Sequence, residues 1–243
     1  MMSVVRWVSL LVALGALKAH AQDIPAAVAK GIVAYNRGDV AGAYRLLKAA
    51  SDTGNSDAQV NLGYLHARGQ GVAQNQQEAL RLYLLSAKQG NAEGMNAVGF
   101  KYRYGTGVQI DLPRAVHSFC RAAVSGDPRG LNNLAIMYDE GKGVEQDRAE
   151  ARNLWRQSAE RGNPNAMFNL GQSLYFEEPL DLARGAELFL QAARLGHGGA
   201  QKNMRQIGYN GALPPVVNTE GEMRPAIKNL PPGKVRDCGS LAS

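Results

Sequence analysis

A short glycine motif recurs along the chain at a fixed interval. The segments "GQGV", "GTGV" and "GKGV" start at Gly69, Gly105 and Gly141, which lie 36 residues apart. Repetition at a period of a few tens of residues is typical of stacked supersecondary units. Each such unit buries its apolar face only against its neighbours, so the period limits the fold to a repeat architecture more strongly than any single motif does.

The residues between the glycine motifs indicate two helices in each repeat. Small residues and a large apolar residue recur four positions apart, as in Ala58 and Leu62 of the first helix. The second helix has Ala79, Tyr83 and Ala87 at the same spacing. Such spacing keeps these side chains on one face of a helix. The aligned units are 56–91, 92–127 and 128–163, followed by a shorter unit at 164–197 without the glycine motif.

Glycines inside the first helix of a repeat predict close contacts between helices. Gly63, Gly99 and Gly171 occupy the same repeat position. A glycine within a helix costs up to about 1 kcal/mol relative to alanine. We therefore expect another helix to pass too close to these positions for a side chain to fit.

The glycine motif itself is predicted to be a helix stop followed by a helix start. A glycine with positive φ would close the first helix, and Asn75 with Glu78, or Asp147 with Glu150, would form a capping box for the second. A phosphate-binding loop is disfavoured because no strand precedes the motif and no Ser or Thr follows Lys142.

This pattern resembles the Sel1-like repeat family, a relative of tetratricopeptide repeats. The resemblance implies an all-α fold, a right-handed α-solenoid of stacked helix-turn-helix repeats, with 56–197 holding four Sel1-like repeats. Residues 22–55 resemble a tetratricopeptide-like N-terminal capping repeat, and 198–209 a lone C-terminal capping helix. The Pro- and Gly-rich tail, 210–243, is either a flexible extension or docked on the last helices, and we favour partial docking because it holds several apolar residues.

The N-terminus predicts export. Residues 1–21 combine Arg6, an apolar run from Trp7 to Leu17 and small residues near the end, which is the layout of a cleavable signal peptide. The protein should then be periplasmic or secreted, with no stable membrane span after cleavage. The alternative is that residues 1–21 stay attached as an uncleaved anchor. The formal charge of +6 would fall to +4 on loss of Arg6 and Lys18, a surplus that does not indicate nucleic-acid binding.

Two cysteines, Cys120 and Cys238, are present. In an oxidising compartment they could pair, and a bridge closing a loop of about 100 residues would contribute about 4 to 5 kcal/mol. The alternative is that Cys120 is a small buried apolar residue beside Phe119. The sequence leaves these two readings equal.

No residue pattern predicts chemistry. After loss of the signal peptide the histidines are His66, His117 and His197, and they have no metal-ligand spacing and no adjacent nucleophile motif. We therefore expect no catalytic residue, metal or cofactor. Some cysteine-rich members of the resembled family are linked to β-lactams, but they carry a cysteine pair in each repeat and this chain does not.

The resemblance to tetratricopeptide repeats also implies a concave groove lined by first helices. Aromatic, arginine and amide side chains in such a groove are typical of a recognition surface. The groove candidates are Tyr64, Arg68, Asn96, Phe100, Arg103, Tyr104, Asn132, Ile136, Phe168, Gln172 and Tyr175. The same register adds Asp57, Val60, Glu93, Arg129, Asp139, Glu140, Asn165 and Phe176.

Asparagine recurs at one position of the first helix, as Asn61, Asn133, Asn169 and Asn203. The asparagines could form a ladder that grips a peptide backbone. We favour the alternative, in which each one satisfies the turn of a neighbouring repeat, because buried polar groups need partners.

The predicted function is a non-enzymatic exported scaffold that binds an envelope protein, or a peptide segment of one, in the groove of the solenoid. One alternative is a cell-wall glycan-binding protein or a hydrolase acting on β-lactams or peptidoglycan, although no paired carboxylates suggest acid and base roles. A second alternative is a secreted factor that contacts a host.

Overall fold

The computed structural model describes residues 26–176, 181–208 and 238. The predicted signal peptide, residues 1–21, lies outside these residues, as does the tail from 210 to 243 apart from Cys238. The described part of the chain is helical and contains no strand. The prediction of an all-α fold made of paired helices is therefore confirmed.

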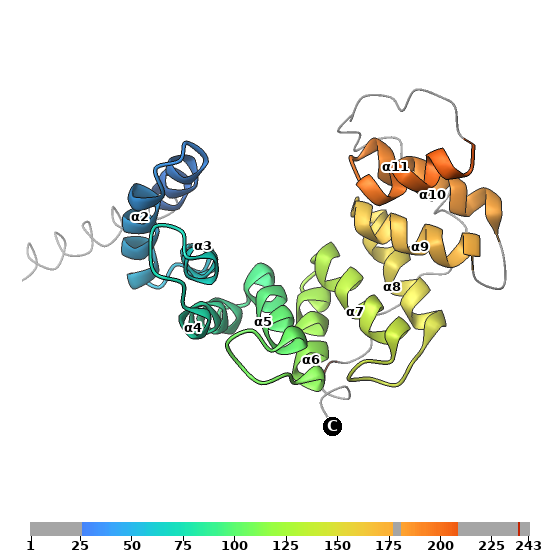
Figure 1. Ribbon diagram of the computed structural model, residues 1–243. Coiled ribbons are helices and arrows are strands. Elements are labelled where there is room, and N and C mark those ends of the chain that lie inside the picture. Colours follow the sequence, from blue (N-terminus) through green and yellow to red (C-terminus); the bar gives the residue numbers. More distant parts are fainter. Residues whose placement is uncertain (1–25, 177–180, 209–237, 239–243) are drawn as a thin grey trace, which may run out of the picture. The chain divides into compact units, whose positions relative to one another are not determined.

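The helices follow one another with short connections (Figure 1). Residues 26–36 are helical and precede α2. The other helices are α2 (Val40–Asp52), α3 (Ser56–Arg68), α4 (Gln76–Lys88), α5 (Ala92–Tyr104), α6 (Leu112–Val124), α7 (Pro128–Glu140), α8 (Arg148–Glu160), α9 (Pro164–Phe176), α10 (Leu182–Arg194) and α11 (Gly198–Gln206). We call α3, α5, α7 and α9 the first helices of the repeats, and α4, α6, α8 and α10 the second helices.

The chain forms two compact units. The first contains the described residues up to Ala97 together with Thr106–Val108, and the second contains Val98–Gly105 and the described residues from Gln109 onward. In the first unit α3 packs against α2 and α4. In the second unit the helices from α6 to α11 each pack against the next one in sequence.

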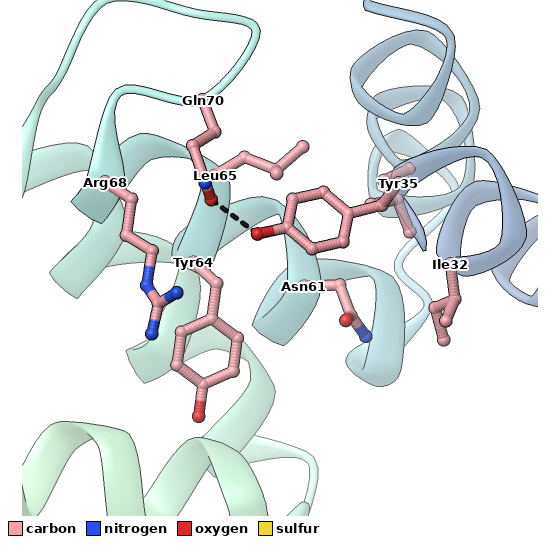
Figure 2. A pocket seen from close by; sticks show the side chains of 8 residues that line it. Ile32, Tyr35, Asn61, Tyr64, Leu65, Arg68 and Gln70 are labelled. Carbon is pink, nitrogen blue, oxygen red and sulfur yellow. Dashed lines mark hydrogen bonds between the residues drawn. The ribbon is translucent and has the colours of Figure 1, made fainter. Parts of the chain in front are cut away.

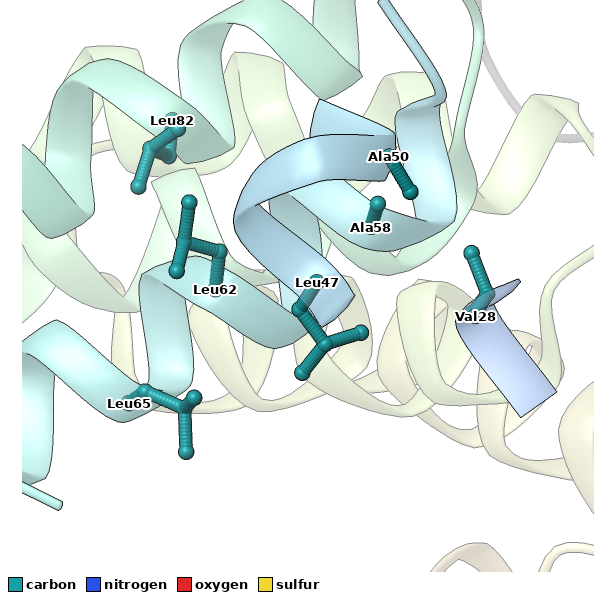
Figure 3. Close-up of a cluster of buried hydrophobic side chains, with 7 residues drawn as sticks. All are labelled: Val28, Leu47, Ala50, Ala58, Leu62, Leu65 and Leu82. Carbon is teal, nitrogen blue, oxygen red and sulfur yellow. The ribbon is translucent and has the colours of Figure 1, made fainter. Parts of the chain in front are cut away.

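The core of the first unit is a cluster of aliphatic side chains (Figure 3). Leu47 and Ala50 come from α2, Ala58 and Leu62 from α3, and Leu82 from α4. These residues have the spacing that the sequence pattern places on one face of each helix. The apolar periodicity therefore accounts for the way in which α2, α3 and α4 bury their inner faces.

Glycines let the two helices of a repeat approach closely, as predicted. A Cβ added to Gly63 would lie 2.5 Å from the Tyr83 ring, and one added to Gly99 would lie 2.4 Å from the Phe119 ring. At Gly171 the corresponding distance to Phe189 is 3.0 Å. An aromatic ring of the second helix thus occupies the space that a first-helix side chain would need.

The helix ends match the prediction only in part. Gly69, Gly105 and Gly141 have φ values of 67°, 69° and 65°, so the left-handed helix stop is confirmed. Asn75 caps α4 by accepting a hydrogen bond from the Glu78 backbone. A capping box also requires the Glu78 side chain to accept a hydrogen bond from the Asn75 backbone N–H, and this part of the prediction is wrong. The Asn75 backbone N–H instead donates to the carbonyl of His66, at 2.9 Å.

In two of the repeats, a polar side chain near the end of the second helix bonds to the first residue of the first helix. Ser86 Oγ donates to the Ser56 carbonyl at 2.9 Å. In the third repeat Ser158 Oγ donates to the Pro128 carbonyl, and Asn163 Nδ2 donates to the same oxygen at 3.0 Å. These bonds fix the two helices of a repeat relative to each other along their axes.

A disulfide joins Cys120 on α6 to Cys238, with 5.7 Å between the two Cα atoms. Cys120 is fully buried. The bridge connects residues 118 positions apart and attaches the chain near its C-terminus to the second unit.

Candidate interaction surfaces

Among the described residues, the exposed aromatic side chains all lie on first helices. They are Tyr64 on α3, Phe100 and Tyr104 on α5, and Phe176 on α9. The second helices expose large apolar side chains too, but these are aliphatic: Leu84, Leu85, Val124 and Leu182. The two kinds of helix therefore present chemically different surfaces.

Phe100, Arg103 and Tyr104 form an ordered cluster on the second unit. The Phe100 and Tyr104 rings are parallel, with centroids 6.2 Å apart, and the Arg103 guanidinium lies 5.3 Å from the Tyr104 ring. Glu140 fixes Arg103 through an ion pair of 2.8 Å. Arg103 is thus held by a carboxylate on one side and an exposed ring on the other.

The exposed ring of Phe100 is anchored on its inner side. Its edge contacts the buried ring of Phe119, with centroids 5.3 Å apart. Phe100 is 41% exposed, and Tyr104 is 59% exposed. The cluster therefore offers aromatic surface while one of its rings is held in place by the core.

Tyr64 has an equivalent arrangement in the first unit. Its ring contacts the buried Tyr83 ring edge-on at 5.5 Å, and its hydroxyl donates to the Glu93 carboxylate at 3.3 Å. These two contacts hold Tyr64 as a fixed, half-exposed ring. Burial raises the pKa of the Tyr83 phenol above its ordinary value, so the Tyr83 phenol stays protonated.

A pocket of about 320 Å³ opens beside Tyr64, between the helix of residues 26–36 and α3 (Figure 2). Its apolar wall is formed by Ile32, Leu47 and Leu65. Leu47 and Leu65 are buried and belong to the core, whereas Ile32 is exposed. The pocket therefore has a fixed apolar floor and an accessible edge.

Polar groups surround the pocket on the α3 side. Asn61, Arg68 and Gln70 line it together with Tyr35. The Tyr35 hydroxyl donates to Gln70 Oε1 at 2.8 Å, the bond drawn in Figure 2. Arg68 is exposed and forms no ion pair with any residue that the structure describes.

The remaining groove candidates differ in accessibility. Asn96 and Asn132 are buried, at 5% and 6% exposure, and contribute to packing rather than to an accessible surface. Gln172 is exposed and Ile136 is half-buried. Phe168 is also half-buried and stacks on His197, with ring centroids 4.4 Å apart, while Tyr175 contacts Phe176 edge-on at 4.8 Å.

We predicted that each recurring asparagine satisfies the turn of a neighbouring repeat. For Asn61 and Asn169 this prediction is wrong. Asn61 Nδ2 donates to the Asp57 carbonyl of its own helix at 2.8 Å. Asn169 Nδ2 donates to Asn132 Oδ1, on the first helix of the preceding repeat, at 3.0 Å. Neither bond goes to a turn: the first stays within α3, and the second joins α9 to α7.

Five residues that line the pocket were not among the sequence candidates: Ile32, Tyr35, Leu47, Leu65 and Gln70. Residues 22–55 lack the glycine motif, so the repeat register could not be extended to Ile32 and Tyr35. Gln70 lies between the two glycines of the first motif, a position that the sequence assigns only to a turn.

The described residues contain no group of three or more His, Cys, Asp or Glu side chains that could hold a metal ion. His117 Nδ1 lies 3.4 Å from the carbonyl oxygen of Cys238. None of the helices in the described ranges is long and apolar enough to span a bilayer.

Comparison with known proteins gives one family match and two informative structures. The family model for the Sel1 repeat matches residues 56–91, 92–127, 128–163 and 164–197. A Sel1 repeat protein from Oxalobacter formigenes is 26% identical, with a TM-score of 0.65, over 74% of this chain and 72% of that chain.

The second structure is a protective antigen present in uropathogenic Escherichia coli strains, which displays an SLR fold. It is 30% identical, with a TM-score of 0.62, over 78% of this chain and 42% of that chain. This chain thus spans less than half the length of the antigen. The comparison with curated proteins gives no match.

Proposed function

Because the chain belongs to the Sel1 repeat family, we propose that it is a non-enzymatic exported scaffold that binds another protein of the envelope, or an extended segment of one. Binding takes place on the accessible side of the first helices. We name two contact regions: the Tyr64–Arg68 region of the first unit and the Phe100–Arg103–Tyr104 cluster of the second.

The observation that carries this proposal is the distribution of exposed side chains. In the described part of the chain, exposed aromatics are confined to first helices, while second helices expose aliphatic residues. Protein interfaces are enriched in aromatic residues and arginine, and such residues supply most of the binding energy. The first helices therefore carry the composition of a recognition surface.

The fixed position of these side chains supports the same proposal. Phe100 rests on Phe119, Tyr64 rests on Tyr83, and Arg103 is held by Glu140. Ordering a free, rotamer-rich side chain costs about 0.5 to 1.5 kcal/mol on binding. Side chains that are already ordered avoid much of this cost, so a partner gains more from each contact.

The proposed location is outside the cytoplasm. The Cys120–Cys238 disulfide is of a kind that persists in oxidising compartments and is rare in the cytosol. The similarity to a protective antigen supports the same location.

Alanine substitutions on the first helices test the proposal. We expect Tyr64→Ala, Phe100→Ala and Arg103→Ala, combined in one variant, to abolish the capture of partner proteins from an envelope extract. The matched control combines Leu85→Ala and Val124→Ala, which remove exposed apolar side chains from second helices.

Thermal unfolding of both variants separates binding from folding. Loss of capture with a melting temperature close to that of the control supports the proposal. Equal capture by both variants would refute it. Unfolding of the first variant alone would show that these side chains are needed for the fold rather than for binding.

A further inference from the structure

We propose that the pocket beside Tyr64 is a subsite for an extended peptide that carries a large apolar side chain next to a carboxylate. This inference rests on the proposed function and adds the chemistry of the segment that is bound. The pocket lies wholly within the first unit, and Figure 2 shows its polar and apolar side chains together.

The apolar part of the pocket fits one large side chain. Leu47 and Leu65 form a floor that is already buried, whereas Ile32 is 40% exposed and Tyr64 is 39% exposed. A ligand side chain placed here would remove apolar surface of Ile32 and Tyr64 from water, at about 25 cal/mol for each Å². The floor needs no rearrangement to accept it.

Hydrogen-bond donors lie at one end of the pocket. Gln70 Oε1 already accepts a bond from Tyr35, so its Nε2 group is the part that is left to donate. Arg68 adds a guanidinium with no ion-pair partner among the described residues. An arginine beside an amide donor selects an acceptor that carries negative charge, and a carboxylate matches the planar guanidinium.

An acceptor lies at the other end. Asn61 Nδ2 is used by the Asp57 carbonyl, which leaves Asn61 Oδ1 to accept a hydrogen bond. A peptide backbone N–H supplies such a donor. The pocket therefore has an acceptor at one end, an apolar floor in the middle and donors at the other end. In a peptide ligand these would face a backbone N–H, an apolar side chain and a carboxylate, in that order.

The length of the site agrees with this assignment. Asn61 and Arg68 are two helical turns apart on α3, which corresponds to about 10 Å along the helix axis. An extended peptide covers that distance in about three residues. A neutral glycan would gain little from Arg68, because it carries no charge to pair with the guanidinium.

A selection experiment on the full chain with its disulfide intact tests the inference. A displayed library of random heptapeptides is selected on the wild-type protein, and the enriched peptides are then measured by fluorescence polarisation. The test variant is Arg68→Gln. The matched control is Arg45→Gln, which removes an exposed arginine on α2 that does not line the pocket.

We expect enriched peptides to carry Asp or Glu next to a large apolar residue, and to bind Arg68→Gln about tenfold or more weakly than Arg45→Gln. Replacing the acidic residue of the peptide by its amide should weaken binding to the wild type equally, with no further loss on Arg68→Gln. Added salt should weaken wild-type binding more than variant binding.

Two results would overturn the inference in distinguishable ways. Peptides that bind Arg68→Gln as tightly as wild type but lose binding to Phe100→Ala would refute the acidic subsite and leave the proposed function standing. A library with no enrichment over a bare surface would refute both the subsite and binding to peptide segments.

Discussion

The absence of a Cβ atom at Gly99 allows α5 and α6 to approach closely. A Cβ at this position would lie 2.4 Å from the Phe119 ring, which is fully buried and also contacts Phe100. The ring has no free side toward which it could move. The same contact therefore sets the approach of α5 and α6 and anchors the exposed ring of Phe100.

We expect Gly99→Ala to destabilise the protein by about 1 to 2 kcal/mol, because the overpacking penalty exceeds the gain in helix propensity. The midpoint of urea denaturation measures the change. Gly198→Ala is the matched control, since nothing lies within 4 Å of a Cβ added there.

A second substitution distinguishes steric conflict from an effect on the helix alone. Combining Gly99→Ala with Phe119→Leu should recover part of the loss, so the two changes should be less destabilising together than their sum. Strict additivity would contradict the account of this contact.

His197 gives a pH dependence at the C-terminal end of the stack. Its Nδ1 accepts a hydrogen bond from the Ala200 backbone and thereby caps α11, and its ring stacks on Phe168. Burial lowers the pKa of His197 below its ordinary value of 6.5. A protonated ring would also lose the capping bond, because Nδ1 could no longer accept.

The folded state therefore binds the proton more weakly than the unfolded state. The contribution of His197 to stability is complete above pH 6.5 and is lost as the pH falls below that value toward the folded-state pKa. We expect amide protection in α11 to be constant above about pH 6.5 and to decrease as the pH falls below it, as measured by hydrogen exchange corrected for intrinsic rates.

His197→Asn keeps a capping acceptor without a titrating group. In this variant the decrease in α11 protection should disappear. An unchanged pH slope would show that another group is responsible.

At the scale of helices, the sequence predicted what depends on local geometry. Gly69 was predictable because a left-handed helix stop involves only neighbouring residues. The bond from the Asn75 backbone to His66 was not, because it depends on how the loop returns to the preceding helix. The candidate recognition surface was partly predictable. Repeat register places Tyr64 and Phe100 on it correctly, but it also places Asn96 there, and Asn96 is buried.

The pocket was the least predictable feature. Ile32 and Tyr35 belong to a segment outside the regular period, so no repeat register assigns them a face. Tyr35 packs against the cluster that contains Leu47 and Leu65, and Ile32 lines the same pocket, so their position beside α3 is set by tertiary packing. Of the lining residues, only Asn61, Tyr64 and Arg68, which lie within the periodic segment, were identified from sequence.

The disulfide acts on the elements of the second unit. It closes a loop of 118 residues, for which the chain-entropy model gives about 4 to 5 kcal/mol and measured values are about 2 to 5 kcal/mol. We expect reduction to lower the free energy of unfolding of the second unit by an amount in that range. Hydrogen exchange should show lower protection in α6 and α7 and unchanged protection in α3.

The control is the double variant Cys120→Ala, Cys238→Ala treated with the same reductant. It should show no change on addition of reductant. An equal loss of protection in α3 and α7 would contradict the view that the two units respond separately to the bridge.

At the scale of the whole molecule, the stacked repeats separate two tasks. Buried rings such as Phe119 and Phe189 hold the helices together, and the exposed rings on first helices are the contacts that we propose for a partner. Since a repeat protein distributes stability over neighbouring contacts, it can tolerate changes on its exposed side chains without losing the fold. Function should thus be separable from stability at Tyr104, which is largely exposed.

Site-specific photo-crosslinking in the producing cells tests the central claim most directly. Benzoylphenylalanine is placed at Tyr104 on a first helix or at Val124 on a second helix, two positions of similar exposure, 59% and 62%. We predict a discrete crosslinked partner from position 104, identified by mass spectrometry, which is lost when Phe100→Ala is added and is absent from position 124. The same product from both positions, or a product from position 124 alone, would contradict the claim that the first helices form the recognition surface.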